Sequence, residues 1–140
     1  MSEHPADSLL NGQLKDDPTI ADTANLWRRI PADWVVEDQN LGRLRPSSKA
    51  FQDHPNGTPM SVLLGDDVTN DGRTAMDALK GLSGFGLVSF SAGFVRQQCG
   101  QGVARDPTPD EPAHAVVFGT KTGGVRNRLA KVADWVIKPS

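Results

Sequence analysis

Short apolar runs separated by polar turns recur along the chain and predict a set of brief extended segments. Each run is rich in β-branched or aromatic residues, which favour strands, and is bounded by residues that favour turns. The runs occupy residues 26–30, 33–38, 60–64, 85–89, 102–106 and 114–119.

Three further segments have the features of helices. Residues 72–80 follow a polar stretch that predicts a turn and supplies a candidate N-cap. Residues 92–99 lie between Ser91, a candidate N-cap, and Gly100, which can end a helix. Apolar residues then recur at helical spacing over 125–136, which predicts a C-terminal helix.

The order of these segments predicts the fold class. Strand and helix signals are mixed without regular β-α-β alternation, so we expect an α+β fold. The 140 residues suffice for a single small domain, with a short mixed or antiparallel sheet and a C-terminal helix. Residues 1–25 carry five acidic residues against one lysine, which predicts a weakly ordered acidic arm that either docks on a partner or frays. Residues 26–140 then form the domain.

Charge and composition narrow the classes of function. Fifteen Lys and Arg oppose 17 Asp and Glu, so net charge directs the chain to neither nucleic acid nor an anionic membrane. No stretch approaches the roughly 18 consecutive apolar residues of a membrane helix, and the N-terminus lacks a secretory pattern, so a cytoplasmic location is expected. One cysteine, Cys99, and three scattered histidines form no ligand set, and the common nucleotide-binding motifs are absent. Neither a metal nor a cofactor is therefore expected.

A group of arginines and serines is the first candidate for chemistry. Arginine forks and serine hydroxyls can grip a phosphate or carboxylate, and Pro46 would hold the neighbouring donors in place. A solvated face of the protein is the alternative interpretation. Lys121, ahead of a Gly pair and the C-terminal helix, is a further candidate, because backbone N–H groups at such a point can bind an anion. The candidate anion-binding residues are Arg28, Arg29, Arg45, Ser47, Ser48 and Lys121.

The second candidate is the pair His114 and Glu111. His114 begins an apolar strand just after an acidic, proline-rich loop that contains Glu111. A histidine in that position can act as a general acid or base, because small environmental changes move its pKa through neutrality. The alternative is a histidine at the edge of the core that is hydrogen-bonded to the backbone.

Two resemblances follow from these motifs. The run LWRRI, LRPSSKAF, PMSV, DPTPDEPAHAVVFG and KT resembles a group of short bacterial proteins of unknown function over residues 26–140. The chain is also similar to the arginine-serine-glutamate class of ADP-ribosyltransferase-like domains, whose arginine, serines and glutamate surround NAD. That resemblance implies these roles for Arg28 or Arg29, for Ser47 with Ser48, and for Glu111. In it, Glu111 stabilises the positive charge that develops on the ribose as nicotinamide leaves.

Two function hypotheses remain. The first is a bacterial binding and assembly protein, a component of a multi-protein system with a protein partner. The second is a small enzyme acting on a nucleotide or other anionic substrate, which requires Arg45, Ser47, Ser48, Glu111 and His114 to line one concave site. Nucleic-acid binding is disfavoured, because the chain has no tyrosine and few other aromatic residues on which bases could stack.

Overall fold

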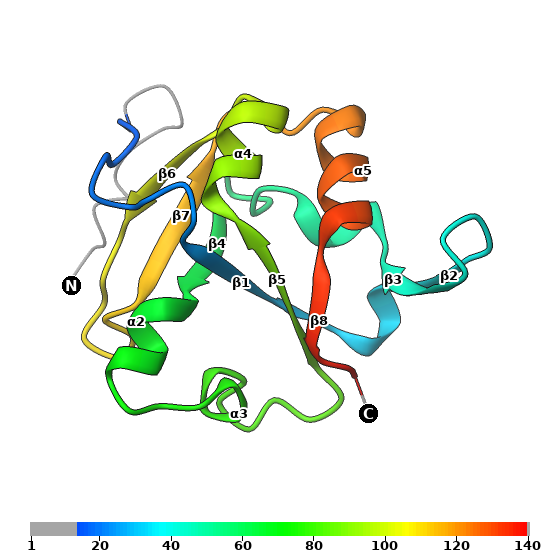
Figure 1. Ribbon diagram of the computed structural model, residues 1–140, viewed down its shortest axis with the longest axis horizontal. Helices are drawn as coiled ribbons and strands as arrows, with labels where there is room; N and C mark the ends of the chain where they lie inside the picture. The colour runs from blue at the N-terminus through cyan, green and yellow to red at the C-terminus, as the bar shows by residue number, and fades with distance from the viewer. Residues whose placement is uncertain (1–13, 140) are drawn as a thin grey trace.

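A six-stranded antiparallel sheet forms the centre of the computed structural model, which describes residues 14–139 (Figure 1). The strand order is β6-β7-β4-β1-β5-β8, and β2 and β3 form a separate two-stranded hairpin. This is the α+β fold expected from the sequence. Within the described residues, no helix combines the length and the apolar character needed to cross a membrane. The strands are β1 (Asn25–Ile30), β2 (Val35–Asp38), β3 (Arg43–Pro46), β4 (Met60–Leu64), β5 (Gly86–Ser91), β6 (Gly102–Arg105), β7 (His114–Phe118) and β8 (Asp134–Ile137), and the helices are α2 (Gly65–Asn70), α3 (Ala75–Ala78), α4 (Ala92–Cys99) and α5 (Gly123–Val132), with 3₁₀ turns η2 (Ala32–Trp34) and η3 (Ser48–Phe51).

Both faces of the sheet are apolar, and different helices cover them. One face packs against α4, α5 and η3 and forms the larger core, which includes Leu26, Val88 and Phe51. The other face packs against α2 and α3 around Leu63, Val68 and their neighbours. Because side chains alternate along a strand, successive residues of β1 belong to different faces.

The central strands β1 and β4 are paired over only part of their length. β1 pairs with β5 along its whole length, from Asn25 to Ile30. With β4 it pairs only at Leu26↔Leu64 and Trp27↔Leu63, while the rest of β4 pairs with β7. The two strands therefore diverge after Trp27, and the sheet has a gap between the second half of β1 and the first half of β4.

The connection between β4 and β5 differs from the prediction. Residues 65–70, predicted as a turn, form α2, and the predicted helix over 72–80 is reduced to the single turn α3. Acidic residues in the first turn of α2 favour a helix N-terminus, and its Val68 is buried in the second core. The next helix, α3, has Thr74 as its N-cap, and Thr74 forms a capping box with Asp77.

The predicted C-terminal helix is present but shorter than expected. α5 ends at Val132, and Asp134–Ile137 form strand β8 instead of further helical turns. These residues include Trp135, Val136 and Ile137, which favour strands, and they pair with the exposed edge of β5. Pairing with a neighbouring strand therefore overrides the helical spacing.

Residues 14–25, assigned to the acidic arm from the sequence, lie against β6 and α4. Asp17 N–H donates to the Val103 carbonyl at 2.8 Å, and Ile20 is 2 % exposed. Arg96 on α4 forms ion pairs with Asp16 and Asp22. The packed part of the chain thus begins before residue 26. The remainder of the predicted arm, residues 1–13, lies outside the described residues.

Candidate anion-binding site

A small hollow opens where β1 and β4 diverge. Its volume is about 60 Å³, which is room for a few water molecules or one small oxyanion. Cross-strand pairing aligns Trp27, Leu63 and His114 in one row on the face that carries α2 and α3. The lining residues are Trp27, Arg28, Arg29, Ser61, Val62, Leu63 and His114.

Arg28 spans the gap between the two strands. Its Nη1 donates to the Ser61 carbonyl of β4 at 2.7 Å, and its Nε donates to the Ala50 carbonyl of η3 at 2.9 Å. Burial lowers the pKa of Arg28 to about 10, against the partly compensating field of Asp53. Among residues 14–139, no carboxylate lies within ion-pair distance of this guanidinium.

The Arg29 side chain lies on the face of the sheet opposite to that of Arg28. Its guanidinium group also has some of its hydrogen bonds made within the protein. Its Nε donates to the Ala78 carbonyl of α3 at 2.7 Å. Its Nη2 is buried and, within residues 14–139, has no hydrogen-bond partner. Burial lowers the pKa of Arg29, and the more distant Glu111 offsets part of this. A buried donor without a partner usually indicates a water molecule or ion at that position.

The walls of the hollow are fixed by packing and hydrogen bonds. Gly65, at the start of α2, lies so close to Trp27 that an added Cβ would be 2.5 Å from the indole ring. His114 Nδ1 lies 2.8 Å from the Asp106 carbonyl oxygen and 3.1 Å from its carboxylate, and Asp106 is itself buried. The aromatic and imidazole side chains are therefore held in place before any ligand arrives.

A second, wider hollow adjoins the first and shares Arg28 and Ser61 with it. It has a volume of about 220 Å³. Its side includes Asp53, whose carboxylate accepts from Met60 N–H and pairs with Lys121. Arg28 thus lies between two hollows. The lining residues of the second are Arg28, Trp34, Gln52, Asp53, His54, Pro55, Pro59, Met60 and Ser61.

Of the predicted site residues, Arg28, Arg29 and His114 come together in the first hollow. Glu111 lines neither hollow. Both of its carboxylate oxygens accept from Arg73 at 2.8 Å, and one also accepts from Ala113 N–H. This pair lowers the pKa of Glu111 and joins the residues between α2 and α3 to the loop before β7.

The other predicted anion ligands lie elsewhere. Arg45 pairs with Asp38 across the β2–β3 hairpin, at 2.6 Å. Ser47 precedes η3, where its Oγ is buried with no partner among the described residues, and Ser48 is the first residue of that turn. None of the three lines either hollow.

Lys121 is a buried structural cation. Its Nζ donates to the carbonyls of Val117 and Gly119 and lies 2.9 Å from the Asp53 carboxylate. Burial lowers the pKa of this lysine, and Asp53 counteracts the shift. The side chain closes the turn between β7 and α5 and lines neither hollow.

Four residues of the hollow, Trp27, Ser61, Val62 and Leu63, were not predicted as site residues. Trp27 has apolar neighbours in the sequence, which favours a core position, and Ser61 is a single polar residue within an apolar strand. Ser61 is the one polar residue of the segment MSVLL. Because side chains alternate along a strand, a polar residue there indicates that one side of β4 contacts something other than the core. Nothing in the sequence indicates that β1 and β4 diverge.

Known proteins offer no template for this site. Comparison with protein-family models, with curated proteins and with solved structures finds no match to this chain. The two resemblances drawn from sequence motifs therefore stay predictions. Within the described residues, no group of three or more His, Cys, Asp or Glu side chains is placed to hold a metal ion.

Proposed function

We propose that this chain is a binding protein that holds one small oxyanion, a phosphate ion or the phosphoryl group of a monoester, in the hollow between β1 and β4. The observation that carries the proposal is the buried, unpartnered Nη2 of Arg29 beside a second arginine that also lacks a carboxylate partner among residues 14–139. An oxyanion in the hollow would accept hydrogen bonds from the Arg29 guanidinium group, which is buried away from solvent.

The electrostatics of the two arginines support an anion as the ligand. Buried charges in proteins are normally paired, because removing an ion from water costs several kcal/mol. Arg28 and Arg29 repel each other, and the carbonyl groups that bind them carry no net charge. A bound dianion would compensate both cations, and planar guanidinium groups bind phosphate oxygens well.

Binding is favoured over the enzyme alternative by the surroundings of Glu111. An acid that stabilises charge on a substrate needs a carboxylate oxygen directed at that substrate. Both oxygens of Glu111 are instead engaged by Arg73. The serines of the transferase resemblance lie at η3, away from the lining of the first hollow.

The proposal is tested by thermal unfolding of the full chain in sodium phosphate against sodium chloride at equal ionic strength. At 100 times its dissociation constant, phosphate should stabilise the protein by about 2.7 kcal/mol. Arg29→Gln should abolish this stabilisation. Arg105→Gln is the matched control, because Arg105 is ion-paired and lies outside the hollow, so phosphate should still stabilise that variant.

The control also separates binding from the general stabilising effect of phosphate, which acts on any protein by exclusion from its surface. If Arg29→Gln is stabilised by phosphate as much as the wild type, the proposal is wrong. Trp27 gives an independent readout, since its fluorescence should change on titration and Trp27→Phe should remove the change. Glycerol phosphate beside inorganic phosphate then distinguishes a monoester group from the free ion.

A further inference from the structure

The hairpin β2–β3 and the edge strand β8 enclose an apolar hollow on the side of the molecule away from β6. Its volume is about 240 Å³. β8 has one strand neighbour, β5, in the six-stranded sheet, so this is an edge of the sheet. Figure 1 shows the hairpin extending outward beside β8 and α5. The lining residues are Ala32, Val35, Leu44, Trp135, Lys138 and Pro139.

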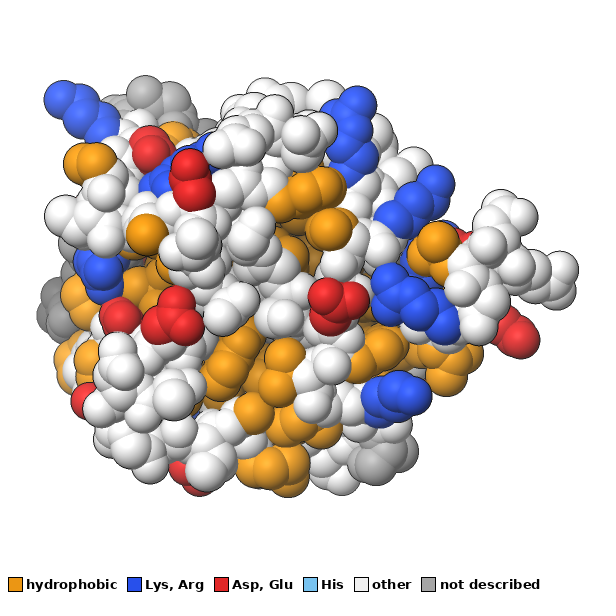
Figure 2. Space-filling model, viewed as in Figure 1, with side chains coloured by type: hydrophobic (Ala, Val, Ile, Leu, Met, Phe, Trp, Pro, Cys, Tyr) orange, Lys and Arg blue, Asp and Glu red, His pale blue; other side chains and the backbone are white. Residues whose placement is uncertain are grey.

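Apolar side chains remain exposed around this hollow. Leu44, which lines the hollow, is 52 % exposed, and Val136, next to Trp135 on β8, is 41 % exposed. Figure 2 shows hydrophobic side chains at this end of the molecule with Lys and Arg side chains beside them. Exposed apolar residues that gather in one place usually mark an interaction site.

The hollow is preformed. Trp135 Nε1 donates to the Leu44 carbonyl at 3.1 Å, which joins β8 to β3. Arg43 Nη2 donates to the Lys131 carbonyl at 3.0 Å, so the hairpin is also tied to the end of α5. A partner would therefore meet fixed walls and lose little free energy in ordering them.

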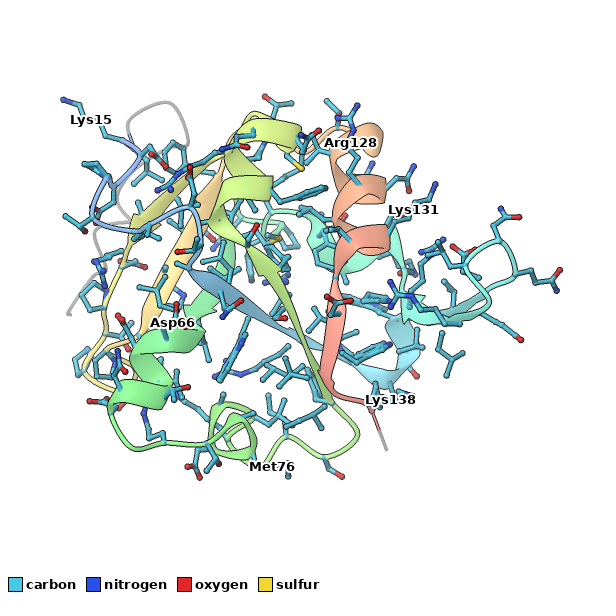
Figure 3. The ribbon with its side chains drawn as sticks, viewed as in Figure 1. Lys15, Asp66, Met76, Arg128, Lys131 and Lys138 are labelled. Atoms are coloured by element: carbon cyan, nitrogen blue, oxygen red, sulfur yellow. The ribbon has the colours of Figure 1, made fainter. Side chains whose placement is uncertain are left out.

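Charge is distributed unevenly over the chain and favours an acidic partner here. Residues 32–49 and 126–138 contain seven Lys and Arg against four Asp and Glu, whereas the rest of the chain contains eight against 13. Asp38 pairs with Arg45, which removes one charge of each sign and leaves an excess of three positive charges in these two segments. Lys131 and Lys138 are exposed, form no ion pair within residues 14–139, and extend from α5 and the end of β8 (Figure 3).

We infer that this surface docks a segment of another protein that combines apolar side chains with Asp or Glu. The apolar side chains fill the hollow between Leu44 and Trp135, and the carboxylates meet Lys131 and Lys138. The hollow has apolar walls with one lysine, which suits a protein side chain better than a nucleotide. A docked protein would go beyond the proposed function, because the docking surface shares no lining residue with the oxyanion hollow.

The test selects a displayed library of random peptides on the full chain and then measures individual synthetic peptides by fluorescence anisotropy. The selected peptides should combine apolar and acidic residues and bind the wild type. Leu44→Asp should weaken their binding at least tenfold. Met76→Asp is the matched control, because Met76 is 64 % exposed and lies on α3, away from the hairpin, and it should bind like the wild type.

Charge is tested separately with Lys138→Glu, which should weaken acidic peptides and reduce the salt dependence of their binding. Leu44 is more than half exposed, so Leu44→Asp should keep the melting temperature of the wild type.

Selected peptides without acidic residues, or equal binding to Leu44→Asp and wild type, would overturn the inference. Sedimentation of the free chain as a dimer that Leu44→Asp dissociates would overturn it too, by assigning the surface to a second copy. Single-stranded DNA added to the peptide complexes should displace none of the selected peptides. Displacement would indicate a nucleic-acid site that overlaps this surface and would overturn the inference.

Discussion

Glu111 and Arg73 form a bidentate ion pair that is largely shielded from solvent. Glu111 has 5 % of its side chain exposed and Arg73 has 26 %, and two parallel N–H···O bonds join them. The pair connects the residues after α2 with the proline-containing loop before β7. Since both segments border the strands of the oxyanion hollow, we assign Glu111 to holding the site together.

Glu111→Gln should therefore lower the free energy of unfolding by about 2 kcal/mol at neutral pH, because hydrogen bonds between charged groups contribute about 1.5–3 kcal/mol. Chemical denaturation of both proteins from pH 7 to pH 3 measures the effect. Arg73 lowers the pKa of Glu111 below its ordinary value of 4.5, so the unfolded chain binds the proton first as the pH falls. The stability from the pair is thus present above pH 4.5 and is lost as the pH falls through the lower, folded-state pKa.

The difference in stability between wild type and Glu111→Gln should consequently be constant above pH 5 and shrink below pH 4.5. Taking the difference removes the contributions of Asp17, Asp38 and Asp77, whose pKa values are also lowered in the folded protein. A difference that stays constant down to pH 3 would mean that the Arg73 pair does not stabilise the carboxylate.

The sequence alone identifies some of the charged residues of this site, but it does not identify the residues that they contact. Arg28 and Arg29 were predicted as anion ligands from their residue type, and the alternation of β1 then directs them to opposite faces of the sheet. Glu111 was predicted as a catalytic residue from its nearness to His114 in the chain and from the transferase resemblance. Its partner, Arg73, is 38 positions away, and such a contact depends on the fold and not on local sequence.

Trp27 and Gly65 connect β1 to the start of α2. The indole ring occupies the space where any other residue at position 65 would place its Cβ. The same ring lines the oxyanion hollow. The close approach of α2 to β1 and the shape of the hollow therefore depend on one glycine.

Gly65→Ala should lower the melting temperature by several degrees, because the added methyl group must displace a packed aromatic ring. It should also weaken phosphate binding, since Trp27 would move within the hollow. Thermal unfolding with and without phosphate measures both effects. Gly124→Ala is the matched control, because its Cβ meets nothing closer than 3.8 Å and alanine favours the helix there. Gly65→Ala with unchanged stability and unchanged phosphate binding would contradict the close packing of Trp27 on α2.

Local signals account for most of the elements. Ser91 caps α4 and Gly100 ends it in a left-handed conformation, as the sequence predicts. The errors occur where the apolar residues are few or the pairing is distant. α2 is a short helix with one buried apolar side chain. β8 is a strand because its residues pair with the side of β5 that no other strand occupies. Tertiary contacts decide both cases.

The fold has a six-stranded sheet with a hydrophobic core on each face, and one peripheral unit. The central strand β1 has a strand on each side and helices over both faces. The hairpin β2–β3 belongs to a separate sheet and contacts the body through Trp135, Arg43 and α5. A two-stranded hairpin has little stability of its own, so these contacts hold it in place.

Native-state hydrogen exchange should therefore show two levels of protection. Amides of β1 and β5 should exchange through global unfolding, and hydrogen-bonded amides of the hairpin should exchange faster through local opening. Arg43→Ala removes the hydrogen bonds to the Lys131 and Ala133 carbonyls, and about 1.4 kcal/mol of lost stability would speed hairpin exchange about tenfold. Lys49→Ala is the control, because this exposed lysine forms no ion pair among residues 14–139, and it should leave exchange unchanged. If Arg43→Ala accelerates β1 as much as the hairpin, the two unfold together, and the docking surface is then as rigid as the core.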